Sequence, residues 1–216
     1  KGFVWYQGES NTGKPGEYAR LQPAMITDWR SKWNEGNLPF LFVQLPGFMD
    51  YNYLPSESQW AMFREAQAKS LSLPNTAMAV AIDVGEWNDV HPDHKKEVSD
   101  RLALAAEKIA YGENVVYSGP LYQSQTIQGN KIIISFNNTG SGLTTNDGEA
   151  PAEFAIAGGD KKFVWAHATI DSDKIIVTNV DVPFPKYVRY AWADDPVNPN
   201  LINKEGLPAS PFRTDQ

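Results

Sequence analysis

The chain has 216 residues, a formal net charge of −7 and no cysteine. Nucleic acids and anionic membrane surfaces select basic patches, so we expect neither as a partner. The absence of cysteine excludes disulfides, thiol catalysis and cysteine-ligated zinc. No apolar run reaches the length of about 20 residues that spans a bilayer. A neutral, polar substrate is compatible with this composition.

The first 112 residues alternate strand and helix patterns. Strands are predicted where short apolar runs occur, at residues 3–6, 39–45 and 76–82. Helices are predicted where apolar residues recur at every third or fourth position, at residues 15–33, 56–73 and 92–111. We expect Ser56 to cap the second helix, Pro92 to lie in the first turn of the third, and Gly112 to end it. This order predicts an α/β fold, with a parallel sheet covered by helices.

After Gly112 the pattern changes to short strands separated by Gly, Asn and Asp. The predicted strands are residues 131–137, 153–156, 163–170, 174–179 and 187–192. Between two of them, Asp171-Ser172-Asp173 indicates a hairpin turn. We therefore predict two domains, an α/β unit at residues 1–112 and an all-β, sandwich-like unit at 113–216. The alternative is that these strands pack directly on the first unit.

His91 is the best single candidate for chemistry among the three histidines. It lies in a loop after a predicted strand, at the edge of the sheet where doubly wound folds place their sites. An imidazole held there by a carboxylate could act as general base for a hydroxyl nucleophile. The alternative is a histidine near a helix N-terminus that hydrogen-bonds surface backbone.

Three acids lie within reach of this loop: Asp83, Glu86 and Asp89. Any of them could orient the imidazole, and Asp89 is closest in sequence. Each could equally be a solvated loop acid or a cap. His91 and His94 could share a helical face, but no third ligand has a suitable spacing, so no metal is expected. No phosphate loop or dinucleotide fingerprint is present, and no cofactor is expected.

The exit of the first predicted strand holds a second group of candidates: Gln7, Gly8, Glu9 and Asn11. Gly8 would let the backbone approach a substrate, and side-chain and backbone amides together can form an oxyanion hole. The alternative is a polar turn that leads into the helix. Ser10 stands in the same segment, but the second glycine of a Gly-x-Ser-x-Gly elbow is missing.

Residues 2–11, Gly-Phe-Val-Trp-Tyr-Gln-Gly-Glu-Ser-Asn, closely resemble the third conserved block of the sialate O-acetylesterases, a branch of the SGNH hydrolases. Later segments agree with the same family in order along the chain: 63–67, 89–92 with Lys95, 101–106, 111–112, 119–120, 188–192, Asn203 and 206–215. The resemblance implies a partial SGNH, flavodoxin-like sheet. It also implies a periplasmic or secreted hydrolase of O-acetyl esters on sugars, either sialic acid or acetylated polysaccharide, without a cofactor.

Carried over by position, His91 resembles the general base of the family. Gln7, Gly8, Glu9 and Asn11 resemble residues that hold the oxyanion or the substrate. Ser10 belongs to this block and is not the family's nucleophile. The wider pattern is Asp-x-x-His, but Asn88 stands three residues before His91, so Asp89 is assigned by proximity, or the site uses a Ser-His dyad.

The nucleophilic serine of the family lies in a Gly-Gln-Ser-Asn block that does not occur in these 216 residues. We therefore expect the chain to be the later part of an esterase, with an upstream segment of the same protein as its partner. The competing hypothesis is a non-catalytic carbohydrate-binding or interaction module, in which Trp87, Tyr51 and Tyr53 stack on sugar.

Overall fold

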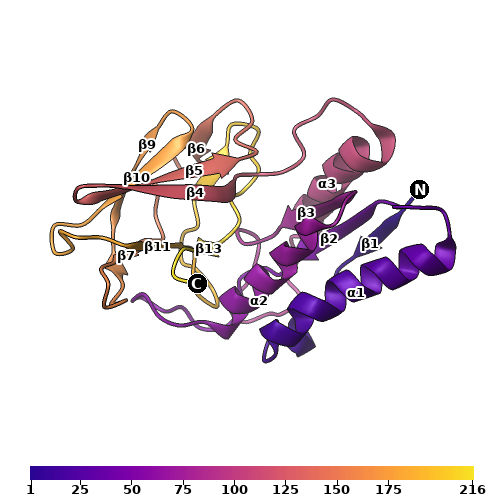
Figure 1. Cartoon of the computed structure of the whole chain (residues 1–216), viewed down its shortest axis with the longest axis horizontal. Helices are drawn as coiled ribbons and strands as arrows, with labels where there is room; N and C mark the ends of the chain where they lie inside the picture. The colour runs from indigo at the N-terminus through magenta and orange to yellow at the C-terminus, as the bar shows by residue number, and fades with distance from the viewer.

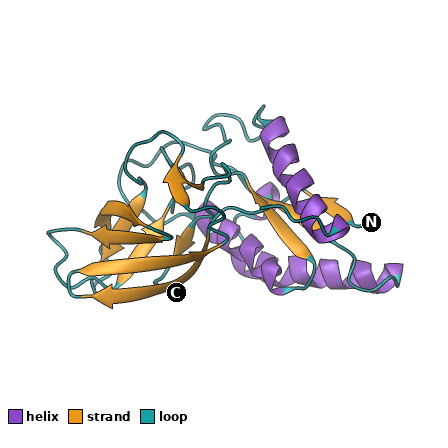
Figure 2. Ribbon diagram, turned by 90° about the horizontal axis from the view of Figure 1, so that it is seen from above, coloured by secondary structure: helices purple, strands orange, loops and turns teal.

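A computed structural model describes all 216 residues. Its first part is a parallel sheet with the order β1-β2-β3, formed by Phe3–Trp5, Phe40–Gln44 and Thr76–Val80. The connecting helices are α1 (Pro15–Trp33), α2 (Gln59–Ala68) and α3 (Lys95–Ala106), and they lie at one end of the molecule (Figures 1 and 2). The predicted α/β fold class is confirmed.

The middle strand β2 is buried on both faces because its side chains alternate between two helical layers. Phe40 and Phe42 belong to a buried cluster with Ile26 of α1. Val43 packs on the other face with Val98 of α3. Three-layer packing of this kind explains why the predicted strand was a continuous apolar run.

Helix α1 begins and ends at the predicted residues, and Gly112 takes the left-handed conformation expected after the last turn. The predicted first turns of the other two helices were wrong. Ser58, not Ser56, caps α2, because its hydroxyl accepts a hydrogen bond from Ala61 N at 2.8 Å. Helix α3 starts at Lys95, three residues after Pro92, because residues 86–94 form a hydrogen-bonded loop. The ends of the predicted helices 56–73 and 92–111 are short 3₁₀ and π turns, Lys69–Ser72 and Glu107–Tyr111.

The second part contains two four-stranded antiparallel sheets. One has the order β4-β5-β10-β9, formed by Leu121–Gln128, Lys131–Asn137, Lys174–Thr178 and His167–Asp171. The other has the order β13-β11-β7-β8, formed by Phe212–Arg213, Tyr187–Tyr190, Phe154–Ala157 and Val164–Trp165. A separate pair joins β6 (Leu143–Thr145) to β12 (Leu201–Asn203). The two layers are visible at the left of Figure 1.

The predicted strand 163–170 is wrong in one respect, because it is two strands. Strand β8 pairs with β7 in one sheet and β9 pairs with β10 in the other, so the chain changes sheets at Ala166. The hairpin between β9 and β10 is confirmed, with Ser172 at φ 55° in its turn. Strand β4 was not predicted because it is largely polar and exposed.

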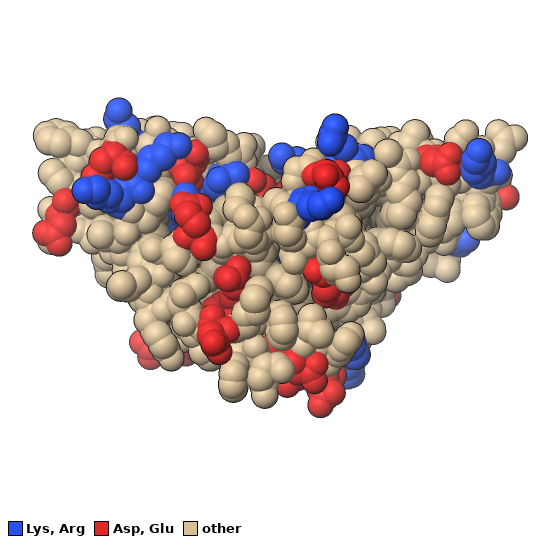
Figure 3. All heavy atoms as spheres, turned by 90° about the horizontal axis from the view of Figure 1, so that it is seen from below, with Lys and Arg blue, Asp and Glu red and all other residues tan.

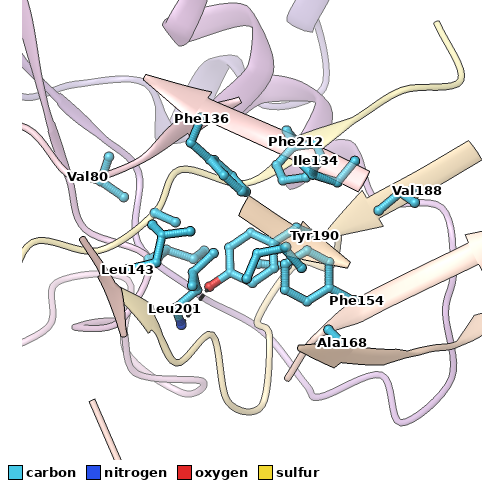
Figure 4. Packing of buried hydrophobic residues seen from close by; sticks show 14 of the residues in the cluster. Val80, Ile134, Phe136, Leu143, Phe154, Ala168, Val188, Tyr190, Leu201 and Phe212 are labelled. Carbon is cyan, nitrogen blue, oxygen red and sulfur yellow. Dashed lines mark hydrogen bonds between the residues drawn. The ribbon is translucent and has the colours of Figure 1, made fainter. Parts of the chain in front are cut away.

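One buried cluster of 21 residues draws on both parts of the chain, from Ile26, Phe42 and Val80 to Tyr190 and Phe212. Figure 4 shows its β-sheet portion, with the Tyr190 hydroxyl accepting a hydrogen bond from Leu201 N at 3.2 Å. The predicted boundary at residue 112 marks a change of architecture. That residues 1–112 and 113–216 are separate domains stays a prediction. The buried cluster that they share argues against independent folding of the two parts.

Candidate active site

Two segments about 80 residues apart meet at one edge of the parallel sheet. The segment after β1 and the loop after β3 both follow the carboxyl ends of their strands, which lie at the same edge. Between them is a cavity of about 450 Å³, lined by Tyr6, Glu9, Ser10, Val90, His91 and Lys95. The fold therefore brings the two groups of sequence-predicted candidates together.

His91 reaches this cavity from an open loop, and its side chain is 85% exposed. Its Nδ1 lies 4.0 Å from Asp89 Oδ1, which is too long for a hydrogen bond. The same carboxylate oxygen accepts a hydrogen bond from the His91 backbone N at 2.8 Å. Asp89 thus fixes the backbone at His91 and holds a negative charge close to the imidazole.

The other two candidate acids have structural partners. Asp83 forms a two-pronged ion pair with Arg101, with both N–O distances 2.7 Å. Glu86 Oε1 accepts a hydrogen bond from Asp93 N at 2.9 Å and so closes the loop that carries His91. Of the three acids, only Asp89 has its carboxylate near the His91 ring.

Gln7 and Asn11 are joined to each other rather than turned into the cavity. Gln7 Nε2 donates to Asn11 Oδ1 at 2.7 Å, and the Tyr18 hydroxyl donates to both oxygens of Gln7 at 3.2 Å. Glu9 and Ser10 are the members of this segment that line the cavity. Gln7 and Asn11 therefore hold the short turn Glu9–Asn11 against α1, and their direct contact with an oxyanion stays a prediction.

Gly8 is buried, and its φ of 152° is one that side-chain-bearing residues rarely adopt. A Cβ at this position would lie 2.5 Å from Cε1 and 2.7 Å from Cζ of Phe63. Its N–H donates to Glu9 Oε2 at 2.9 Å. Close packing against Phe63 explains the glycine here, and the approach of a substrate to its backbone stays a prediction.

Comparisons with a family model, with curated proteins and with solved structures all match carbohydrate acetylesterases. A family model described as carbohydrate esterase, sialic acid-specific acetylesterase, matches residues 1–108, half of the chain. The chain belongs to this family of carbohydrate esterases. The sialate O-acetylesterases of mouse and human are each 29% identical over 98% of the chain, which covers 44% and 45% of their lengths. A crystal structure of a carbohydrate acetylesterase from Xanthomonas citri is 45% identical, with a TM-score of 0.93 over 100% of this chain and 50% of that one.

The chain therefore spans about half the length of the relatives that it matches. Strand β1 has no neighbour on its outer side, and Val4 in its middle is 64% exposed. Parallel strands of α/β folds are normally covered on both faces.

Two cavity residues of this esterase-family chain were not assigned a role from sequence. Lys95 Nζ donates to Pro92 O at 2.6 Å and lies 5.8 Å from the centre of the Tyr6 ring, a cation–π distance. Burial raises the pKa of Tyr6 to about 12, and the charge of Glu9 adds to the effect. The Tyr6 phenol is thus a neutral hydrogen-bond donor near pH 7. Both residues lie in segments that carry the family resemblance, but only the fold shows that they contact each other.

Nowhere in the structure do three or more His, Asp or Glu side chains converge in a way that could hold a metal ion. The Nδ1 atom of His94, the histidine nearest to His91 in sequence, lies 3.5 Å from Glu97 Oε1. None of the helices combines the length and hydrophobicity needed to cross a bilayer. On the face drawn in Figure 3, Lys and Arg are interspersed with Asp and Glu and form no continuous basic patch.

Proposed function

We propose that this chain carries the general base and part of the substrate cavity of a carbohydrate O-acetylesterase. The observation that supports this most directly is the shared cavity, in which residues of the first-strand segment face His91. Family membership supports the ester-hydrolysis chemistry. An acetylated sugar is the proposed substrate, and a periplasmic or secreted location is proposed because such glycans are met outside the cytoplasm.

The proposed reaction is a two-step acyl transfer. A serine hydroxyl attacks the acetyl carbonyl while His91 takes its proton. Collapse of the tetrahedral intermediate breaks the bond to the sugar oxygen, which receives that proton from His91. Water, deprotonated by His91, then attacks the acetyl-enzyme and releases acetate and the free serine. Asp89 would orient His91, and the Tyr6 phenol and the backbone amides of Glu9 and Ser10 would stabilise the oxyanion, since the amides of Gly8 and Asn11 already donate to Glu9 Oε2 and Gly8 O.

We propose that the serine comes from an upstream segment of the same protein. Phe3 N donates to Pro39 O, so the backbone groups of the next residue, Val4, point to the open side of the sheet. A further parallel strand placed there could pair with the free backbone groups of Val4. Such a segment would also lie beside the cavity and could shield the exposed His91 and Asp89 side chains, which are 85% and 55% exposed.

Ser10 is the alternative nucleophile, because it lines the same cavity as His91. Its hydroxyl makes no hydrogen bond to the imidazole, and its segment lacks the elbow glycine. The predicted role of Ser10 is therefore structural, and the experiment below includes it.

The test compares His91→Ala, Ser10→Ala and the matched control His94→Ala in the complete protein, with acetate release from 4-nitrophenyl acetate and an O-acetylated saccharide as readouts. We expect His91→Ala to lower kcat by about 10²–10⁴-fold, the usual contribution of a general base. The kcat values of the control His94→Ala and of Ser10→Ala should both stay within a few-fold of the parent value. A near-normal rate for His91→Ala would refute the assignment, and loss of activity in Ser10→Ala would make Ser10 the nucleophile. Glycan binding by a parent protein that hydrolyses neither substrate would select the binding-module hypothesis.

A further inference from the structure

The imidazole of His91 makes no hydrogen bond of its own, although it is the group that would move the proton. Its side chain is 85% exposed, and the nearest carboxylate oxygen, Asp89 Oδ1, lies 4.0 Å from Nδ1. The direction of the ring therefore depends on the backbone to either side of His91, because a side chain chooses among a few rotamers that its backbone allows.

The two neighbours of His91 are anchored, while His91 itself lines the cavity. Val90 packs on the buried cluster that contains Trp60. Pro92 is buried, and the backbone N of His91 donates to Asp89 Oδ1 at 2.8 Å. The loop thus presents the imidazole from a backbone that is attached to the core before and after it.

A single peptide group directly after His91 is held on both of its sides by side chains of opposite charge. Glu86 Oε1 accepts a hydrogen bond from Asp93 N at 2.9 Å, and Lys95 Nζ donates to Pro92 O at 2.6 Å. This N–H and this C=O belong to the same peptide, Pro92–Asp93. Hydrogen bonds to ionised partners are stronger than neutral ones, and each charge here meets the end of the peptide dipole that it attracts. We call these two contacts the peptide clamp.

Both side chains of the peptide clamp come from fixed parts of the fold. Lys95 is the first residue of α3, and its Nζ lies 5.8 Å from the centre of the Tyr6 ring. Tyr6 directly follows β1 and packs against two separate buried clusters. The backbone O of Glu86 accepts a hydrogen bond from Asp89 N at 3.2 Å. A turn of the Pro92–Asp93 peptide would break both charged contacts at once.

The peptide clamp contributes little to global stability. The hydrogen bond from Asp93 N to Glu86 is exposed, and Lys95 is an exposed residue. Water would replace the lost partners at such positions, so the net energy of each contact is small. The arrangement is better explained by the local geometry that it fixes beside the imidazole.

We propose that Glu86 and Lys95 are positioning residues that hold the Pro92–Asp93 peptide and thereby fix the direction in which His91 meets the reacting groups. This rests on the proposed function, since both residues would act through His91 as the base. Glu86 would orient the imidazole through the backbone and not by contact with the ring.

The test uses the complete protein with Glu86→Ala and Lys95→Met, each of which removes one side of the peptide clamp. Lys96→Met is the matched control, because Lys96 is the next residue of α3 and pairs with Asp100 instead. Misdirection of the imidazole should lower kcat on 4-nitrophenyl acetate and an O-acetylated saccharide about 10–100-fold, with KM within about threefold of the parent value. Glu86→Gln and Lys95→Arg keep an acceptor and a donor in place, so their kcat should stay within about threefold of the parent value.

A purely structural role would not depend on His91, so Glu86→Ala and Lys95→Met are repeated in the His91→Ala protein. There each should lower the residual kcat by less than about twofold, because the residue through which the clamp acts is gone. A loss as large as in the parent protein, a rise in KM at unchanged kcat, or an equal loss in Lys96→Met would overturn the proposal.

Amide hydrogen exchange gives a readout that does not require activity. Glu86→Ala and Lys95→Met should raise the exchange rate of the Asp93 amide by at least about threefold, and Lys96→Met should leave it unchanged. If the parent protein releases no acetate from either substrate, the proposed function fails, but faster exchange in the two variants would still support the peptide clamp. Unchanged exchange in both variants would refute the clamp whatever the activity.

Discussion

Replacing Gly8 with alanine tests the packing on which the first-strand segment depends. The new methyl group would lie 2.5 and 2.7 Å from two ring atoms of Phe63, well inside van der Waals contact. The ring cannot easily move away, because Phe63 is fully buried and its centroid is 4.4 Å from that of Tyr18. Backbone strain at this φ costs about 1–3 kcal/mol, and overpacking costs a similar amount. We expect Gly8→Ala to lower the free energy of unfolding by about 2–5 kcal/mol.

The measurement is urea unfolding followed by tryptophan fluorescence, with Phe63→Leu and the double variant completing a thermodynamic cycle. Leucine lacks the ring atoms that meet the new methyl group, so the double variant should be at least about 1 kcal/mol more stable than the sum of the single losses predicts. Gly16→Ala is the control, because it lies in the first turn of α1 with nothing within 4 Å of its Cβ position, and should stabilise by about 0.5–1 kcal/mol. If the losses of the two single variants add up in the double variant, or if Gly8→Ala costs less than about 1 kcal/mol, contact with Phe63 is not the reason why position 8 requires glycine.

Two further predictions concern α2 and the base of the loop after β2. Ser58→Ala should lower the free energy of unfolding by about 1–2 kcal/mol, because it removes the cap of Ala61 N and a hydrogen bond to Asp194. Ser56→Ala should change it by less than about 0.5 kcal/mol, because the Ser56 hydroxyl has no hydrogen-bond partner. Equal effects of the two variants in urea unfolding would contradict the cap assignment. Burial raises the pKa of Asp195 to about 6. The folded state then binds this proton more tightly than the unfolded state, so the contribution to stability is fully present below about pH 4 and is lost as the pH rises to about 6. Asp195→Asn should remove this slope and stabilise the protein at pH 7 by about 1 kcal/mol, a value reduced for solvent screening; an unchanged slope in the pH dependence of unfolding would refute it.

Local sequence signals determined the elements whose stabilising contacts lie close in the chain. The spacing of apolar residues gave α1 its bounds, and the left-handed Gly112 marked the end of the third helical segment. The turn at Ser172 joined two apolar strands as predicted. In each case the determining interactions span only a few residues, so the pattern contains them.

Only the tertiary structure decided features that depend on distant partners. Ser58 caps α2 in place of Ser56 because its hydroxyl also meets Asp194, 136 residues away. Asp83 is engaged by Arg101, and the chain changes sheets at Ala166, neither of which has a local signal.

The candidate site divides in the same way. The sequence supplied His91, Asp89 and the segment from Gln7 to Asn11, through residue types and a family resemblance. The fold alone brought His91 next to Glu9 and Ser10 and placed Lys95 over Tyr6. The physical reason is that parallel pairing of β1, β2 and β3 puts their carboxyl ends at one edge, and this register depends on contacts between residues about 40 positions apart.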